Sequence, residues 1–230
     1  MSYLLYFSPD SANIVVRMVL EELGVEYESR RVPDNRSDRD DEFFALNPRG
    51  LLPVLIDGEA DATLFETGAI ILYLADKHQT LAPGHQEPAA RAECLRWLFL
   101  LSNTLHADLV RNFYSERFAD DARTARGVKE TAAKRVGDHL ALIDQHIELS
   151  DGDWFLSSGL SICDFYLGAC VRWAQLYPEG DPALTATDVH RFEALSTLLD
   201  RTQELPSVQV AMEKERIGGP AFVEPLYPSD

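Results

Sequence analysis

The sequence of 230 residues is 46% hydrophobic and 26% charged, which fits a folded globular protein of one large domain or two smaller ones. The formal net charge of −17 is spread along the chain, and a surface of that sign repels phosphate backbones and anionic lipids, so nucleic acid and membrane partners are not expected. No apolar run approaches the ~20 residues of a membrane span, and the N-terminus lacks the positive start of a secretory signal, which indicates a cytoplasmic protein.

The first third of the chain has the pattern of alternating strands and helices, because short apolar runs are separated by Gly, Asp and charged segments. Strands are predicted at 3–7, 27–32, 51–57 and 62–65, and helices at 11–23, 43–48 and 67–77. The first helix has Ser11 at its predicted N-cap, and residues 34–42 form a charged surface loop. This order predicts an α/β domain over residues 1–80.

The remainder of the chain has no strand pattern. Residues 81–88 are rich in Pro and Gly and are typical of a linker. Apolar residues at helical spacing predict helices at 89–118, at 124–149, from Ser161 onwards, at 187–204 and at 207–216. Ser161 and Asp164 have the spacing of a capping box, which marks the start of their helix. Residues 89–230 are therefore predicted to form an all-helical domain.

The three cysteines are Cys94, Cys163 and Cys170, and none belongs to a C-x-x-C pair. An odd count without such pairs does not suggest a disulfide framework, so core packing is expected for all three. The sequence also contains no metal-ligand cluster, no phosphate-binding glycine loop and no Ser-His-Asp arrangement. Metal chemistry is therefore not expected.

The apolar run GLLPVL (50–55) contains Pro53, which has no N–H to give to a strand ladder. One interpretation is a cis Leu52–Pro53 bond in a tight turn at the start of the strand. The Leu52 amide and carbonyl are then free to pair with an extended ligand. The other interpretation is an edge-strand proline without a ligand, and the local residues do not choose between the two.

Two further segments place hydroxyl groups at helix N-termini, where free amides and the helix dipole attract anions. Glu66 and Thr67 stand at the start of the helix at 67–77, and together they suit the ammonium and carboxylate of an amino-acid head group. Ser11 stands at the start of the first helix, where a bound thiol ionises more readily. On local grounds alone, an ordinary helix cap is the simpler interpretation of each segment.

Taken together, these segments resemble the glutathione transferase family. The motifs LYFSP, MVLEELGVEYE, NPRGLLPVL, LFETGAIILYLADKH and SICDFYL occur in the order and spacing of that family, over residues 3–175. Each motif alone is weak, whereas the ordered set is specific. The resemblance implies a thioredoxin-like N-terminal domain, an all-helical C-terminal domain and usually a homodimer.

The resemblance also implies roles for the segments described above. In that family the proline is cis and the backbone before it pairs with the cysteinyl part of glutathione, a role that falls on Leu52 and Pro53. An acidic residue and a hydroxyl before the helix hold the γ-glutamyl head group, which corresponds to Glu66 and Thr67. The segment PDSAN resembles the P-x-S-x-N of members whose serine bonds the glutathione sulfur, so Ser11 is the catalytic candidate.

The sequence departs from the family at several positions. No cysteine precedes Cys94, so chemistry through an enzyme–glutathione mixed disulfide is not expected. Leu51 stands where several relatives have a Gln that bonds glutathione. Tyr6 and Asn13 are the alternative thiol donors, although a Tyr in a strand is commonly a core residue. Arg39 loosely matches a basic residue that holds the glycyl carboxylate.

The segment SNTLHADL resembles members with a His that faces the thiol. His106 is therefore a candidate for polarising the second substrate or positioning the sulfur, and interdomain packing explains it equally well. Asn103, Phe113 and Tyr114 are candidates for lining the same second-substrate pocket.

The sequence thus predicts a glutathione transferase of the kind that serves detoxification, in which the thiolate of bound glutathione attacks a small electrophile. Glutathione and the electrophile are the expected partners, together with a second copy of the chain. Two alternatives remain open: a glutathione-dependent isomerase or peroxidase, and a binding protein of the same fold without catalysis.

Overall fold

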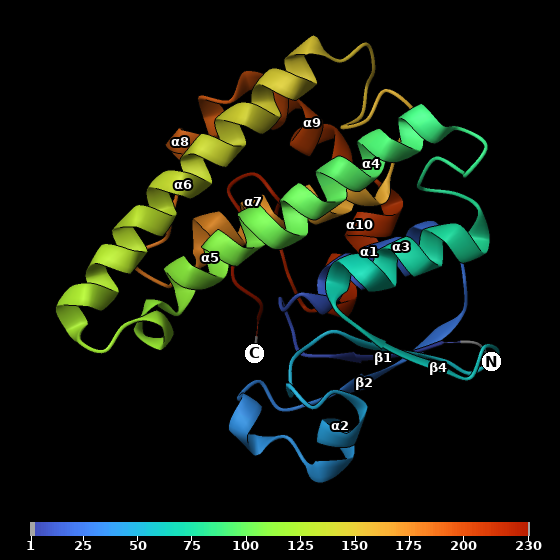
Figure 1. Ribbon diagram of the computed structural model, residues 1–230, viewed down its shortest axis with the longest axis horizontal. Helices are drawn as coiled ribbons and strands as arrows, with labels where there is room; N and C mark the ends of the chain where they lie inside the picture. The colour runs from blue at the N-terminus through green and yellow to red at the C-terminus, as the bar shows by residue number, and fades with distance from the viewer. Residues whose placement is uncertain (1–2, 230) are drawn as a thin grey trace.

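A computed structural model describes residues 3–229. Its sheet has the strand order β2-β1-β3-β4, in which β1 runs parallel to β2 and antiparallel to β3, and β3 runs antiparallel to β4. The strands are β1 (Tyr3–Phe7), β2 (Tyr27–Arg31), β3 (Val54–Asp57) and β4 (Ala62–Phe65). In Figure 1 the sheet lies below most of the helices.

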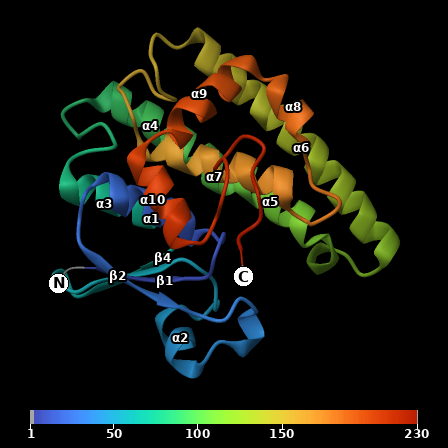
Figure 2. The same cartoon turned by 180° about the vertical axis from the view of Figure 1, so that it is seen from behind.

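Helices cover both faces of the sheet. α1 (Asn13–Glu22) and α3 (Thr67–His78) pack on one face, and α2 (Asp41–Leu46) lies on the other (Figures 1 and 2). The alternation of side chains along β1 explains the two layers, since neighbouring residues of a strand point to opposite faces. Leu5 joins the large core with α1 and α3, whereas Tyr6 joins a small cluster beneath α2.

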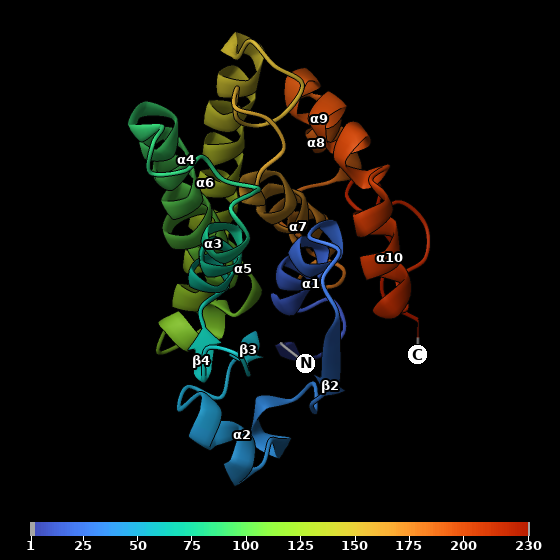
Figure 3. The same cartoon turned by 90° about the vertical axis from the view of Figure 1, so that its right-hand side faces the viewer.

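The second half of the described chain is helical. Its helices are α4 (Pro88–Leu100), α5 (His106–Phe113), α6 (Ala122–Leu149), α7 (Ile162–Leu176), α8 (Ala186–His190), α9 (Glu193–Gln203) and α10 (Pro206–Lys214). Every residue of α7 except Gln175 is buried, which makes α7 the central helix of this half. α1 packs against both α7 and α10, and Figure 3 shows α1 and α10 side by side.

These two parts confirm the predicted fold class, a thioredoxin-like α/β unit followed by an all-helical unit. The domain limits of 1–80 and 89–230, with the linker between them, remain a sequence prediction. The predicted capping box is also confirmed, because the Ser161 side chain accepts the amide of Cys163 and Asp164 accepts the amide of Ser161. All three cysteines are buried and free, as expected. No helix of residues 3–229 is long and apolar enough to span a membrane.

The prediction of one continuous helix over 89–118 is wrong, because this range contains two α-helices and two tighter or wider turns. A π-helical turn at Leu101–Leu105 separates α4 from α5, and Tyr114 leaves helical geometry with φ −127° and ψ 43° before a 3-10 turn at Ser115–Phe118. A second 3-10 turn, Arg36–Asp38, interrupts the charged loop. The helix predicted at 187–204 is divided into α8 and α9, because Phe192 between them has φ −94° and ψ 83°, outside the helical region.

The first helix begins later than predicted. The N-cap is Ala12 rather than Ser11, and no side chain caps this helix. Asp10 has a positive φ of 56°, and the Ser11 amide donates to the Ser8 carbonyl at 3.2 Å, so the chain makes a turn before α1 begins. Ser11 is therefore part of this turn, and its side chain bonds Asn13 instead of capping α1.

A buried carboxylate terminates β3. Oδ2 of Asp57 accepts bonds from Lys77 at 2.5 Å and Tyr73 at 2.7 Å, and Oδ1 accepts the amides of Glu59 at 3.0 Å and Ala60 at 3.2 Å. Burial acts to raise the pKa of Asp57, but these donors outweigh it and lower the pKa to about 2. The network ties β3 to α3.

Asp57→Asn is expected to destabilise the protein in a pH-dependent way. Because the folded pKa lies below the ordinary value of 3.8, the stabilisation is fully present above pH 4 and is lost as the pH falls through about 2. The free energy of unfolding is expected to fall by about 2 kcal/mol at pH 7, and the difference from wild type to shrink below pH 4. Urea titrations at pH 7 and pH 3 measure both effects. Glu59→Gln changes an exposed partner of Lys77 and is the control; an equal loss in both variants contradicts this account.

Candidate functional site

The strand register brings three segments together at one edge of the sheet. Tyr6, near the end of β1, pairs with Val54 at the start of β3, and Val54 pairs with Phe65 at the end of β4. The residues that follow β1, precede β3 and follow β4 therefore leave the sheet at neighbouring points. These segments hold Ser11, the Leu52–Pro53 pair, and Glu66 with Thr67.

Ser11 and Asn13 form a hydrogen-bonded unit. The half-buried Ser11 hydroxyl donates to Oδ1 of Asn13, which also accepts the amide of Ser8 at 3.1 Å. Nδ2 of Asn13 donates to the Glu215 carboxylate at 2.6 Å. Because an N–H donor faces one side of the Asn13 amide and a carboxylate faces the other, the orientation of that amide is fixed. Ser11 is therefore the donor in its bond with Asn13.

Glu215 ties this unit to the C-terminal half. It follows α10 and also accepts bonds from Arg17 of α1 at 2.9 Å and from the amide of Asp10 at 2.8 Å. The Arg17 and Glu215 side chains are 1% and 0% exposed. Burial raises the pKa of Glu215 to about 7, against the opposing effect of Arg17. The turn that holds Ser11 thus rests on charged groups with almost no solvent contact.

Tyr6, the alternative thiol donor, is not brought to this unit. Its ring packs against Phe43 of α2, with ring centroids 5.6 Å apart, and its hydroxyl accepts a bond from Arg30 at 3.2 Å. Tyr6 lies on the sheet face that α2 covers, opposite to α1. Asn13, the other alternative, is by contrast in direct contact with Ser11.

The Leu52–Pro53 bond is cis, as predicted from the sequence. β3 begins only at Val54, so the Leu52 backbone lies outside the strand ladder. The approach to this turn is tight, because Gly50 has a φ of 60° and a side chain there would meet the Phe44 ring at 2.3 Å. Glycine is required at that point.

Arg39 fastens the charged loop to this turn. Its guanidinium donates to the carbonyls of Gly50 at 2.7 Å, Pro33 at 3.0 Å and Asp34 at 3.3 Å. These bonds use three of the five N–H donors of an arginine, so two remain. Burial lowers the pKa of Arg39, with the charge of Asp34 opposing.

The start of α3 leaves backbone amides without a side-chain cap. Glu66 occupies the N-cap position with φ 74° and ψ 114°, and its side chain makes no capping bond. It pairs instead with Arg49 at 2.8 Å, and both side chains are about 60% exposed. Thr67, the first residue of the helix, is buried. Uncapped amides and the helix dipole together favour an anion at this point.

His106, the first residue of α5, contacts two residues of α7. Its Nδ1 is 2.9 Å from the hydroxyl of Tyr166, and its ring centroid is 5.0 Å from that of Trp173. Burial lowers the pKa of His106 to about 4, so the imidazole is neutral at pH 7. Tyr166 interacts in turn with Thr67, an interaction that lowers the pKa of Tyr166 against the larger raising effect of burial.

The other candidates for the second-substrate pocket are less closely connected. The half-buried Phe113 ring lies 6.0 Å from that of Tyr177, whose hydroxyl donates to Asp10. Tyr114 is 40% exposed, with the Arg117 guanidinium 3.8 Å from its ring centroid. Asn103 is exposed in the π-helical turn and accepts a bond from its neighbour Ser102.

Sequence analysis did not select the buried charges that support this edge. The missed residues are Asp10, Arg17, Arg172 and Glu215. A signal was present in the two arginines, which stand inside the apolar runs NIVVRMVL and GACVRWAQL. A buried guanidinium needs a paired carboxylate, although the sequence does not say which one.

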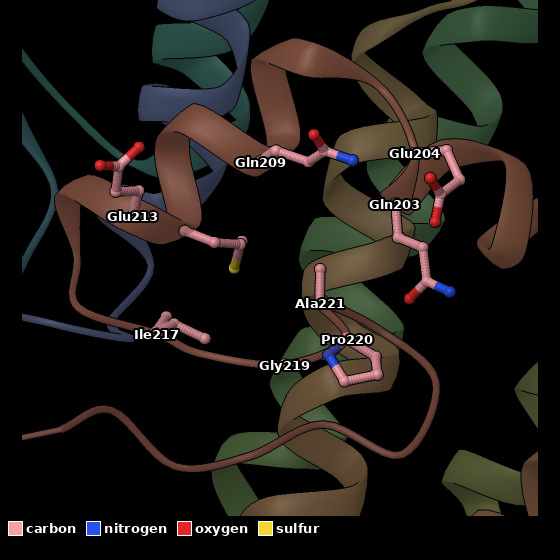
Figure 4. A pocket seen from close by; sticks show the side chains of 9 residues that line it. Gln203, Glu204, Gln209, Glu213, Ile217, Gly219, Pro220 and Ala221 are labelled. Carbon is pink, nitrogen blue, oxygen red and sulfur yellow. The ribbon is translucent and has the colours of Figure 1, made fainter.

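One hollow of the described surface lies elsewhere. It has a volume of about 440 Å³ and is enclosed by the end of α9, α10 and the chain from Ile217 to Ala221, as Figure 4 shows. None of the candidate site residues lines it. Within residues 3–229 no group of three or more His, Cys, Asp and Glu side chains is placed to hold a metal ion.

Comparison with known proteins agrees with this geometry. Residues 14–77 match the family model of the glutathione S-transferase N-terminal domain, and residues 104–215 match that of the C-terminal domain. A glutathione transferase family member from Pseudomonas fluorescens, solved with two glutathione molecules bound, has 27% sequence identity and a TM-score of 0.75, over 92% of each chain.

The curated relatives include two glutathione S-transferases of Escherichia coli, GstA and GstB. Glutathione S-transferase GstA of strain O157:H7 is 27% identical over 217 residues, covering 92% of this chain and 98% of the relative. Glutathione S-transferase GstB of strain K12 is 33% identical over 159 residues, covering 65% of this chain and 71% of the relative. The matched domains, the relatives and the shared architecture lead to one conclusion: this chain belongs to the glutathione S-transferase family.

Proposed function

We propose that the protein is a glutathione transferase, in which the thiolate of bound glutathione attacks an electrophilic small molecule. The observation that carries the proposal is the convergence of Ser11, the cis Leu52–Pro53 bond and the start of α3 at one edge of the sheet. A tripeptide would lie along this edge with its cysteinyl backbone paired to Leu52, its γ-glutamyl group at Glu66 and Thr67, and its sulfur at Ser11.

The two charged ends of glutathione have suitable partners. The γ-glutamyl carboxylate would accept the amide and hydroxyl of Thr67 at the uncapped helix start. Its ammonium would meet Glu66, whose ion pair with Arg49 is exposed and therefore weak enough to exchange. The glycyl carboxylate would accept the two N–H donors that Arg39 keeps beyond its bonds to carbonyls.

Thiol activation follows from a competition between two hydrogen bonds of Ser11. Without a ligand the hydroxyl donates to Asn13, a neutral bond of about 1 kcal/mol, whereas a bond to a thiolate contributes about 1.5–3 kcal/mol. Because the bond to the thiolate is the stronger of the two, the Ser11 hydroxyl would rotate away from Asn13 and donate to the sulfur. Oδ1 of Asn13 keeps the Ser8 amide as a donor and is not left unpaired. Ionised glutathione is thereby favoured over the thiol.

The second substrate would approach from the helical half. His106 is neutral at pH 7 and offers a hydrogen bond to the electrophile without repelling or neutralising the thiolate. Phe113 would supply an apolar side to the same approach, and Tyr114 and Asn103 would line its outer part. A cytoplasmic role in detoxification fits this chemistry.

The alternatives use the same edge differently. A glutathione-dependent isomerase or peroxidase would keep the activated thiol, whereas a binding protein of this fold would lack activity altogether. Calorimetric titration with glutathione, followed by assays with a panel of electrophiles, peroxides and isomerisable substrates, separates these cases. Glutathione binding without turnover of any of them supports the binding protein, and failure to bind glutathione rejects the proposal.

Thr67→Ala is expected to weaken glutathione binding by about 1–2 kcal/mol, because a charge-assisted hydrogen bond to the γ-glutamyl carboxylate is lost. Calorimetry measures the dissociation constant directly. Thr63→Ala, a loss of the same hydroxyl from an exposed position of β4, is the matched control and is expected to bind as wild type does. Unchanged affinity in Thr67→Ala removes Thr67 from the site.

Ser11→Ala is expected to lower the rate with a general electrophile about tenfold or more while leaving glutathione affinity nearly intact, because a bond of about 1.5–3 kcal/mol to the thiolate disappears. The absorbance of the bound thiolate, followed against pH, is expected to show a raised thiol pKa. If rate and pKa both stay as in wild type, Ser11 has only a structural role. Asn13 and Tyr6 are then the next positions to substitute.

The proposed enzyme is a homodimer. Phe65 of β4 and Phe99 of α4 are 39% and 54% exposed, and β4, α3 and α4 lie along one side of the molecule in Figure 3. Phe99→Asp is expected to shift the sedimentation coefficient from that of a dimer to that of a monomer, because a charge in the apolar contact is costly to bury. Leu149→Asp, at a 76% exposed position at the end of α6, is the control. A wild-type protein that sediments as a monomer refutes the dimer.

A further inference from the structure

Asp10, the residue before Ser11, has all its polar groups bonded to the C-terminal half. Its amide donates to Glu215 at 2.8 Å, and its carbonyl accepts the indole N–H of Trp173 at 3.0 Å. Its carboxylate accepts hydrogen bonds from Nε and Nη2 of Arg172 at 2.7 and 2.9 Å. It also accepts the hydroxyl of Tyr177 at 2.8 Å. No other residue of the β1–α1 turn is held in this way within the described chain.

The backbone of Asp10 explains why so many bonds are needed. Its φ of 56° lies in the left-handed region, which residues other than glycine seldom occupy, although Asn and Asp do so more often than most. Such a conformation persists only where the surroundings over-determine it, and it is common at functional sites. Without its partners Asp10 would relax, and the next residue, Ser11, would turn with it.

Arg172 is the strongest of these partners. Its side chain is 0% exposed, and the paired Asp10 side chain is 1% exposed. Beyond the bidentate pair, its guanidinium donates to the carbonyls of Ala221 at 3.1 Å and Leu226 at 2.6 Å. The planar guanidinium matches a carboxylate through two parallel bonds, so it fixes the direction of the Asp10 side chain as well as its position.

The same helix reaches the other end of the candidate site. Trp173, next to Arg172 on α7, packs against His106 with the two rings tilted by 33°, and Tyr166 of α7 bonds His106 and interacts with Thr67. α7 therefore contacts both the turn that presents Ser11 and the start of α3. Its buried, rigid backbone sets the separation of these two points.

We propose that Arg172 is a positioning residue of the glutathione site: acting through Asp10, it holds the turn so that the Ser11 hydroxyl faces the sulfur. The inference rests on the proposed function, because it concerns the same thiol. It adds a requirement from the helical half to a site whose glutathione-binding groups come from the first half.

The test compares two bidentate Arg–Asp pairs that join the halves. Arg172→Lys keeps the charge but loses the paired arms. It is expected to raise the pKa of bound glutathione by about 0.5–1 unit and to lower kcat about threefold to tenfold, with KM for glutathione nearly unchanged. Arg91→Lys is the matched control, because Arg91 binds Asp76 at 2.7 and 2.8 Å away from Ser11. It is expected to leave the thiol pKa as in wild type.

Tyr177→Phe provides a milder second variant in case Arg172→Lys does not fold. It removes one donor from Asp10 and keeps the ring, so a smaller rise in the thiol pKa is expected. A double-variant cycle tests whether Arg172 acts on the thiol through Ser11. In the Ser11→Ala background, Arg172→Lys is expected to raise the thiol pKa no further. An additional rise there means that Arg172 acts otherwise than through Ser11, and overturns the inference.

The results separate this inference from the function on which it rests. If wild type binds glutathione with a lowered thiol pKa that depends on Ser11, and Arg172→Lys behaves as Arg91→Lys does, only the positioning role is refuted. If wild type does not bind glutathione, the proposed function fails and the positioning role fails with it.

Discussion

The ion pair of Asp10 and Arg172 joins the two halves of the chain where water is almost excluded. Removing two charges from water is expensive, and the energy is recovered only if the geometry is good and the remaining donors and acceptors are satisfied. Here both arms of the guanidinium meet the carboxylate, and Trp173 and Tyr177 complete its bonding. The conformation of the turn at Asp10 therefore depends on residues of the helical half.

Sequence patterns were sufficient for elements whose cause is local. The capping box at Ser161 fixes a helix start through neighbouring residues, and the apolar stripe of α6 is long enough to be unambiguous. The cis bond before Pro53 was one of two open interpretations until the motifs were considered together. The start of α1 was placed wrongly because the φ of Asp10 depends on distant partners that local propensity does not contain.

The candidate site shows the same division. Ser11, Glu66 and Thr67 stand in short motifs, so the sequence selects them, and the strand register then brings their segments together. The residues that support them could not be predicted in the same way, because they lie far away in the sequence. The orientation of Asn13 is set by Glu215, a residue 202 positions away. The sequence indicates pairing at that separation only indirectly, through a charged residue inside an apolar run.

The contact between Asp10 and Arg172 has a consequence for how the protein is made. The two residues are 162 positions apart, and at the usual pace of translation the second emerges roughly 10–30 s after the first. The carbonyls of Ala221 and Leu226, which complete the bonding of Arg172, follow later still. During synthesis the early sheet and α1 have no partner for the Asp10 carboxylate, which remains hydrated. The turn that presents Ser11 therefore takes its final shape only after α7 and the chain as far as Leu226 have been made, although it leaves the ribosome long before them.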